Sequence, residues 1–161
     1  MATSGMESRG ASGVAIRRLT TSDVPAVSAI LQESPEAAAW SEDSLLRFTS
    51  AESAAWVAVV NGVVAGFLVG RIAADEFEIL NMAVSRAHRR TGVGSNLLET
   101  ALEFSHMAGS ARAYGEVRVS NGPALALYAR HGFAECGCRP QYYRDPAEDA
   151  VLLSLRSGGA Q

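Results

Sequence analysis

One segment of the chain joins an apolar, strand-like run to an amphipathic helix through a basic turn that holds two glycines. It reads Val84-Ser-Arg-Ala-His-Arg-Arg-Thr-Gly-Val-Gly-Ser-Asn-Leu-Leu98. Glycine allows a ligand close to the backbone, and the first N–H groups of a helix have no acceptor within it and lie at its positive end. Together with the arginines, the segment predicts a site for a phosphate-bearing ligand, and a solvated basic turn is the alternative interpretation.

Two familiar phosphate motifs do not explain this segment. No Gly-Lys-Ser/Thr sequence occurs, which excludes a Walker A loop. The dinucleotide-binding fingerprint needs a third glycine, and none follows Gly94 at the required spacing. The ligand class must therefore come from the rest of the chain.

The composition describes one ordinary domain. The chain has 161 residues, of which 48% are hydrophobic and 19% charged, enough for one compact core and too short for two usual domains. A net charge of −3 argues against nucleic-acid binding through overall positive charge. We expect Gly/Ser-rich tails at 1–13 and 157–161 around a domain at 14–156. Because the apolar runs are strand-sized and the first residues are polar, we expect no membrane span, no signal peptide and a cytoplasmic protein.

The hydrophobic pattern alternates between strand-like and helical periods. It predicts strands over 14–19, 55–60, 63–69, 77–84, 111–119, 133–139 and 150–155. It predicts helices over 21–32, from Ser41 onward, over 92–107 and over 123–129. The pair Asn61-Gly62 is typical of a type I′ hairpin turn. We therefore expect a mixed α/β or α+β fold with a largely antiparallel sheet.

Several of these segments resemble motifs of the GCN5-related N-acetyltransferase (GNAT) family. They are Arg89-Arg-Thr-Gly-Val-Gly94, the strand Glu78-Ile-Leu-Asn-Met-Ala-Val84, and Asn121-Gly-Pro-Ala-Leu-Ala-Leu-Tyr128 followed by His131-Gly-Phe133. Within that family the chain is most similar to the bacterial ribosomal-protein-alanine N-acetyltransferases. That similarity lies in Trp40-Ser-Glu42, Glu116-Val-Arg-Val-Ser-Asn121, and Tyr142-Tyr143 followed by Glu148-Asp-Ala150. The resemblance extends from about Val14 to Leu155.

The resemblance implies a fold, a cosubstrate and a set of residues. The fold is a mixed, mostly antiparallel sheet with a V-shaped split, flanked by helices. The cosubstrate is acetyl-CoA, whose pyrophosphate and pantetheine arm would contact Met82, Ala83, Val84, Arg89, Arg90, Thr91, Gly92, Val93, Gly94, Ser95 and Asn121. The acceptor would lie against Trp40, Tyr142 and Tyr143, for each of which simple packing is the alternative. A helix cap explains Asn121 nearly as well.

Acetyl transfer to an amine needs a base for the ammonium and an acid for the departing thiolate. By the resemblance, Glu116 is the general base, acting through water, and Tyr128 is the general acid. A glutamate partly removed from water accepts a proton more readily, which suits a base. The alternatives are that Glu116 faces solvent, paired with a cross-strand arginine, and that Tyr128 is a core aromatic residue.

We therefore expect an acetyl-CoA-dependent enzyme that acetylates a protein N-terminal α-amine, specifically the N-terminal alanine of a small-subunit ribosomal protein. A lysine or small-amine acetyltransferase is the alternative within the same class, and a non-catalytic acyl-CoA-binding module is the alternative outside it. We expect a monomer or weak dimer that contacts neither nucleic acid nor membrane. We expect no metal, because Cys136 and Cys138 lack further ligands and are interpreted as small apolar strand residues.

Overall fold

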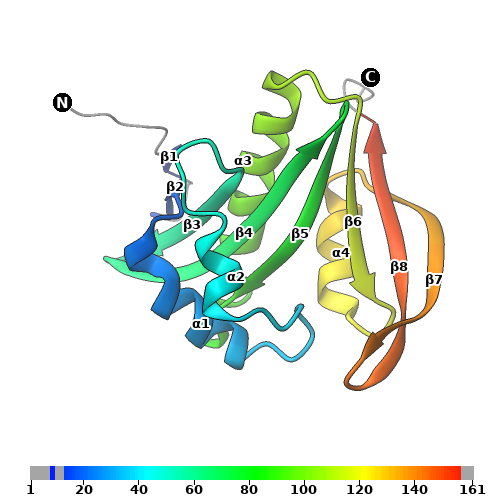
Figure 1. The fold of residues 1–161 in the computed structure, drawn as a ribbon, viewed down its shortest axis with the longest axis horizontal. Coiled ribbons are helices and arrows are strands. Elements are labelled where there is room, and N and C mark those ends of the chain that lie inside the picture. Colours follow the sequence, from blue (N-terminus) through cyan, green and yellow to red (C-terminus); the bar gives the residue numbers. More distant parts are fainter. Residues whose placement is uncertain (1–7, 10–12, 157–161) are drawn as a thin grey trace. The chain divides into compact units, whose positions relative to one another are not determined.

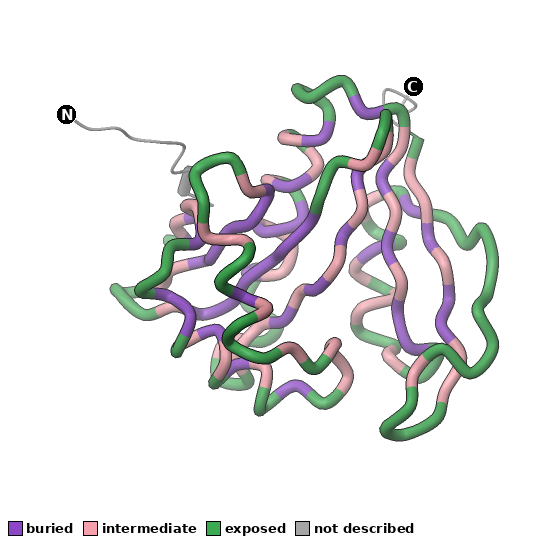
Figure 2. Tube along the Cα trace, in the orientation of Figure 1, coloured by how far each residue is buried: buried purple, intermediate pink, exposed green. Residues whose placement is uncertain are grey.

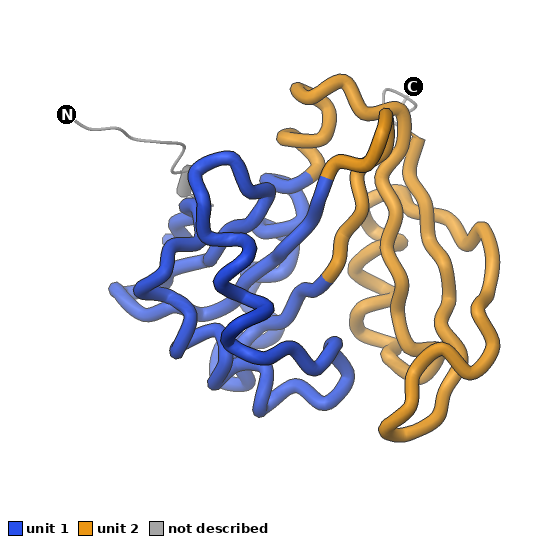
Figure 3. The backbone as a smooth tube through the Cα atoms, in the orientation of Figure 1, with its two compact units in different colours: residues 1–71, 81–101 blue, residues 72–80, 102–161 orange. Residues whose placement is uncertain are grey.

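The computed structural model of the chain describes residues 8–9 and 13–156. The chain forms two compact units, shown in different colours in Figure 3. The first comprises residues 1–71 and 81–101, and the second comprises residues 72–80 and 102–161. Strand β5 (Glu76–Val84) and helix α3 (Val93–Met107) contribute residues to both units.

The remaining helices α1, α2 and α4 and the remaining strands are labelled in Figure 1. In chain order they are β1 (Ser8–Arg9), β2 (Ala15–Arg18), the 3-10 turn η1 (Thr21–Asp23), α1 (Val24–Gln32), α2 (Glu42–Leu46), β3 (Ala55–Val60), β4 (Val63–Ala73), the 3-10 turn η2 (Arg86–His88), β6 (Arg112–Arg118), α4 (Gly122–Arg130), β7 (Ala134–Arg144) and β8 (Ala147–Arg156). This succession confirms the predicted mixed α/β class.

The first unit is built on an antiparallel run in which β1 pairs with β2, β2 with β3 and β3 with β4. The β3–β4 turn has the predicted geometry, with φ of 51° at Asn61 and 79° at Gly62. Trp56 and Phe67 are fully buried in its core, and Figure 2 shows the buried course of these strands. Their burial makes this unit a rigid base for the segments that follow β5.

Gly66 of β4 sets how closely the start of α3 approaches the strand. A Cβ at this position would lie 3.0 Å from Cγ1 of Val93 and 3.1 Å from the carbonyl oxygen of Ala83. Only a residue without a side chain leaves room for both, because the carbonyl belongs to the backbone and cannot turn away. The glycine therefore fixes the position of the helix start that follows the basic turn.

The second unit contains the parallel ladder of the fold. Residues Glu76 to Glu78 of β5 pair in parallel with Arg112 to Tyr114 of β6. The ladder ends there although both strands continue, which is what a split sheet requires. On its other side β6 pairs antiparallel with β8, and β8 pairs antiparallel with β7. Helix α4 packs on this group through the buried Tyr128, and Phe133, which follows the helix, is buried beside it.

Several predictions need correction or extension. The last two strands are longer than predicted and form a hairpin over Ala134–Arg144 and Ala147–Arg156. Cys136 and Cys138 lie on the strand β7, as predicted, and both are exposed. Among the described residues β7 pairs only with β8. The predicted tails lie outside the described residues except Ser8–Arg9, which form β1, and Gly13. No helix in the described part of the chain is long and apolar enough to cross a membrane.

Candidate active site

The basic turn in the first unit presents backbone N–H groups at the start of α3. Arg90 and Gly92 both adopt left-handed backbone conformations, with φ of 64° and 89°. The carbonyl of Gly92 accepts the N–H of Asn96 at 3.0 Å and its side-chain amide at 2.9 Å. The helical N–H groups before Asn96, in Val93–Ser95, therefore have no helical acceptor. They provide the donors that the sequence predicts for an anion.

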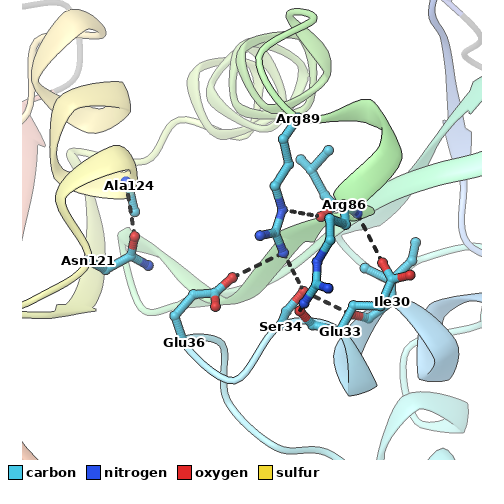
Figure 4. Close-up of polar contacts among 9 residues, drawn as sticks. Ile30, Glu33, Ser34, Glu36, Arg86, Arg89, Asn121 and Ala124 are labelled. Atoms are coloured by element: carbon cyan, nitrogen blue, oxygen red, sulfur yellow. Dashed lines mark hydrogen bonds and ion pairs between the residues drawn. The ribbon is translucent and has the colours of Figure 1, made fainter.

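Arg89 does not extend freely from this turn. Figure 4 shows its guanidinium donating to the carbonyl of Val84 at 3.0 Å and to the hydroxyl of Ser34 at 3.0 Å. It also forms an ion pair with Glu36 at 3.3 Å. These contacts tie the end of β5 to the segment between α1 and α2. Arg89 thus shapes the turn with its side chain, and Arg90, nearer to Gly92, is also exposed.

The segment between α1 and α2 is attached to β5 a second time. The buried side chain of Asn81 donates to the carbonyl of Ala38 at 3.0 Å. Two residues later Trp40 stacks on Phe48, with ring centroids 5.4 Å apart and planes 16° apart. Trp40 is half-buried, and its stacking on Phe48 fits the packing alternative, while its role at the acceptor stays a prediction.

In the second unit, the predicted base Glu116 comes from β6 and the predicted acid Tyr128 from α4. A Cβ on Gly115 would point at Tyr128 and lie 3.2 Å from its Cε1, Cζ and hydroxyl oxygen. Because side chains alternate along a strand, Glu116 points to the other face. Tyr128 therefore packs against one side of β6, and Glu116 points away from it on the other side.

Glu116 is paired with an arginine, as the alternative interpretation proposed. Nε of Arg139 lies 2.6 Å from Oε2 of Glu116. Tyr142 is the second neighbour: burial, the charge of Glu116 and a hydrogen bond to that carboxylate raise the pKa of its hydroxyl. The guanidinium of Arg139 also lies 5.6 Å from the centre of the Tyr142 ring. Glu116, Arg139 and Tyr142 therefore form one cluster.

A bulge in β7 brings Tyr142 to this cluster. Arg139 pairs with Ala150 and Tyr143 with Glu148, so three residues of β7 face a single residue of β8. Within the bulge Gln141 has a φ of 57°. Its N–H donates to the side chain of Asp149 at 2.8 Å. The extra residues shift the side chains of β7 relative to the sheet, which is a common use of bulges at functional sites.

Tyr128 is buried with 4% of its surface exposed. Its ring meets Phe133 edge to face, with centroids 4.9 Å apart. Burial, with a smaller contribution from Tyr143, raises the pKa of the Tyr128 phenol above its usual range. The phenol therefore stays protonated at neutral pH, which an acid requires. Its burial also fits the alternative interpretation of Tyr128 as a core aromatic residue.

Arg118 holds the turn that joins β7 to β8, because it donates to the carbonyls of Asp145 and Pro146. It is buried and its guanidinium lies 4.3 Å from the centre of the Tyr143 ring. The guanidinium also donates to Glu148 at 3.2 Å, and that carboxylate accepts the N–H of Ser120 at 2.7 Å. The pKa of Tyr143 is raised to about 12, first by burial and then by the charge of Glu116. Tyr143 is thereby fixed beside Tyr142, 5.1 Å away between centroids.

Asn121 caps helix α4, because its side chain accepts the N–H of Ala124 at 3.2 Å (Figure 4). Its amide nitrogen is a further donor, and its cofactor role stays a prediction. Sequence reasoning did not identify Arg139, Arg118 or Asn81 as site residues. The sequence predicted that an arginine could pair with Glu116. Which arginine does so depends on the register of the β7–β8 hairpin.

Comparison with known proteins gives a family for this arrangement. The profile described as the acetyltransferase (GNAT) family matches residues 18–133. The [ribosomal protein bS18]-alanine N-acetyltransferase of Escherichia coli is 34% identical over 142 residues, covering 87% of this chain and 95% of that protein. An N-alpha-acetyltransferase of Sulfurisphaera tokodaii is 34% identical over 116 residues, covering 64% and 69%.

Solved structures agree in fold. The ribosomal-protein-S18-alanine N-acetyltransferase from Escherichia coli has a TM-score of 0.79 at 34% identity and covers 92% of this chain and 96% of its own. Ard1 from Thermoplasma volcanium has a TM-score of 0.82 at 29% identity and covers 89% and 97%.

Proposed function

The chain belongs to the GNAT family of acetyltransferases, and from this premise we propose that it acetylates the N-terminal alanine of a ribosomal protein with acetyl-CoA. We propose this acceptor because the chain is similar to the bS18-alanine enzymes over nearly its whole length. The site residues below are proposed with the roles that their surroundings favour.

The first unit fits the phosphates of acetyl-CoA. The N–H groups of Val93–Ser95 and the left-handed Gly92 offer donors that a phosphate can approach closely. Arg90 adds an exposed positive charge, while Arg89 acts by holding the end of β5 in place. The backbone of Met82–Val84 would pair with the amides of the pantetheine arm, as an added strand does. Acetyl-CoA supplies the thioester.

In the second unit, Glu116 accepts the proton of the acceptor ammonium, directly or through water. An α-amine has a pKa near 7.8 and a lysine amine near 10.4, so making lysine neutral costs roughly 3.5 kcal/mol more. A single carboxylate therefore suits an N-terminal α-amine. Tyr142 and Tyr143 would form one wall for the acceptor.

Tyr128 donates its proton to the departing thiolate. Burial keeps the phenol protonated across the working pH range, so a proton is present when the thiolate forms. The tight contacts to Gly115 and Phe133 hold the ring in one position. Bulk water returns the proton after each turnover.

Steady-state acetylation tests the proposal. We expect turnover with a peptide that begins with free alanine and none when its N-terminus is blocked and only a lysine is free. Turnover of the lysine peptide or of small amines alone would favour the alternative acceptor class. Acetyl-CoA binding in calorimetry without turnover of any amine would show a non-catalytic binding module.

A further inference from the structure

The ion pair between Arg139 and Glu116 crosses a whole strand. Glu116 lies on β6 and Arg139 on β7, with β8 hydrogen-bonded between them. Neighbouring strands are about 4.8 Å apart, so the two backbones are separated by roughly 10 Å. Arg139 pairs with Ala150 and Glu116 pairs with Leu152, two residues away on the same face of β8. The guanidinium therefore reaches across β8 to meet the carboxylate.

This contact is close but weakly fixed. The side chain of Arg139 is 58% exposed, against 28% for Glu116. Tyr142 shares a hydrogen bond with this carboxylate, yet Oε2 of Glu116 is shielded from water and has no hydrogen-bond partner in the described part of the chain. The guanidinium at 2.6 Å thus supplies charge without directed bonding. A better-aligned N–H donor would find this oxygen available.

Arg118, the nearby cation on the same strand as Glu116, is committed elsewhere. It donates to the carbonyls of Pro146 and Asp145 and to Glu148. Leu152, opposite Glu116 on β8, carries no charge. The positive charge at the carboxylate therefore comes from Arg139 on the exposed strand β7.

We infer that Arg139 occupies, in the free enzyme, the place on Glu116 that the acceptor ammonium takes, and so determines acceptor specificity. This inference rests on the proposed function. An ammonium group brings its own charge and aligned N–H donors, so it replaces the guanidinium without leaving the carboxylate unpaired. Both cations at one carboxylate would repel each other. An uncharged group that displaced Arg139 would leave Glu116 without an ion pair. The replacement of Arg139 by the acceptor therefore favours cationic acceptors.

The test compares three variants with the native chain. Arg139→Gln removes the competing cation, Arg139→Lys keeps one, and Arg144→Gln removes an exposed cation elsewhere on β7 as the matched control. The probe is a peptide with a free N-terminal alanine. We measure its Kd by calorimetry in the presence of CoA, which holds no acetyl group, and its KM and kcat with acetyl-CoA.

We expect Arg139→Gln to lower the Kd and KM of the peptide about two- to five-fold, the range for opening a partly exposed ion pair. Arg139→Lys and Arg144→Gln should stay near the native values. High ionic strength should reduce the difference, because salt screens the native ion pair. An unchanged or raised Kd in Arg139→Gln would overturn the inference.

Failure of the proposed function gives a different result. If the native chain binds the peptide but acetylates no amine, the proposed function fails, while the Kd comparison still decides the role of Arg139. If the native chain acetylates the peptide and the Kd of Arg139→Gln is not lowered, the proposed function stands and the inference fails. A peptide that binds none of the chains at all overturns both.

Discussion

Replacing Gly115 by alanine tests the placement of Tyr128 with a single methyl group. The new Cβ would lie 3.2 Å from Cε1, Cζ and the hydroxyl oxygen of Tyr128. Carbon atoms pack best at about 3.5–4.0 Å, so the ring must move by a few tenths of an ångström. Phe133 stands against the ring at 4.9 Å between centroids, and the ring has almost no exposed surface into which it can shift.

The stability effect follows from two opposing quantities. Overpacking of this kind costs about 1–3 kcal/mol, and alanine in place of glycine returns about 0.4–1 kcal/mol by restricting the unfolded chain. We expect Gly115→Ala to lower the free energy of unfolding by roughly 1–2 kcal/mol. For a chain of this length the Tm should fall by about 2–8 °C.

The catalytic effect is larger than the stability effect suggests. A misplacement of 1 Å at a reacting group can cost about a hundred-fold, so a shift of a few tenths should reduce kcat about three- to ten-fold. The Kd of acetyl-CoA should not change. In a Tyr128→Phe background the same substitution should change kcat little, because the donated proton is already absent.

Gly137→Ala is the matched control on the same sheet. A Cβ there would lie 3.7 Å from Leu152, an ordinary contact, so we expect native kcat and a Tm equal to or slightly above native. Thermal unfolding and steady-state kinetics on both variants decide the matter. Equal Tm and equal kcat in Gly115→Ala and Gly137→Ala would refute the placement of the phenol against β6.

Three further outcomes are expected. Gly92→Val should abolish acetyl-CoA binding in calorimetry, because its φ of 89° strains a β-branched residue and the side chain crowds the N–H groups; native affinity would contradict this. Tyr128→Phe should lower kcat with near-native acetyl-CoA binding, and unchanged turnover would remove its acid role. The raised pKa of Tyr143, about 12, means that the folded chain holds a proton which the unfolded chain loses above pH ~10. Stability should therefore fall as pH rises from 10 towards 12, and less steeply in Tyr143→Phe; equal slopes of Tm against pH would be inconsistent with the burial of this phenol.

The sequence predicted features that depend on neighbouring residues. Asn61 and Gly62 tolerate positive φ, so the hairpin turn could be located without tertiary information. Ser41 accepts the N–H of Ser44 at 3.2 Å, the N-cap contact that its position indicated. The helical period after Gly92 predicted a helix over 92–107, and the observed helix is Val93–Met107, one residue shorter at its start.

Features that depend on register could not be predicted in the same way. The segment Arg139-Pro-Gln looks like the end of a strand, because proline cannot donate to a ladder. The chain instead bulges there and continues, which brings Tyr142 to Glu116 and sends Arg139 across β8. The exposure of the cysteines follows from the same outer position of β7, which no local pattern reveals.

The role of Arg89 also depends on a distant segment. A basic residue beside a glycine turn suggests a phosphate contact, and nothing nearby in the sequence indicates Ser34 or Glu36 as partners. The two side chains meet Arg89 only after the chain has passed through three strands and returned. The periodicity of the sequence and the spacing of its motifs do not predict such long-range partners.

Mass spectrometry of intact small-subunit ribosomal proteins tests the central claim most directly. The proteins, isolated with unmodified N-termini, are incubated with the chain and acetyl-CoA, with Glu116→Gln as the comparison. The account predicts one added acetyl group on the α-amine of a protein that begins with alanine, formed much more slowly by Glu116→Gln. Acetylation only at lysine side chains, or none while acetyl-CoA binds normally, would contradict it.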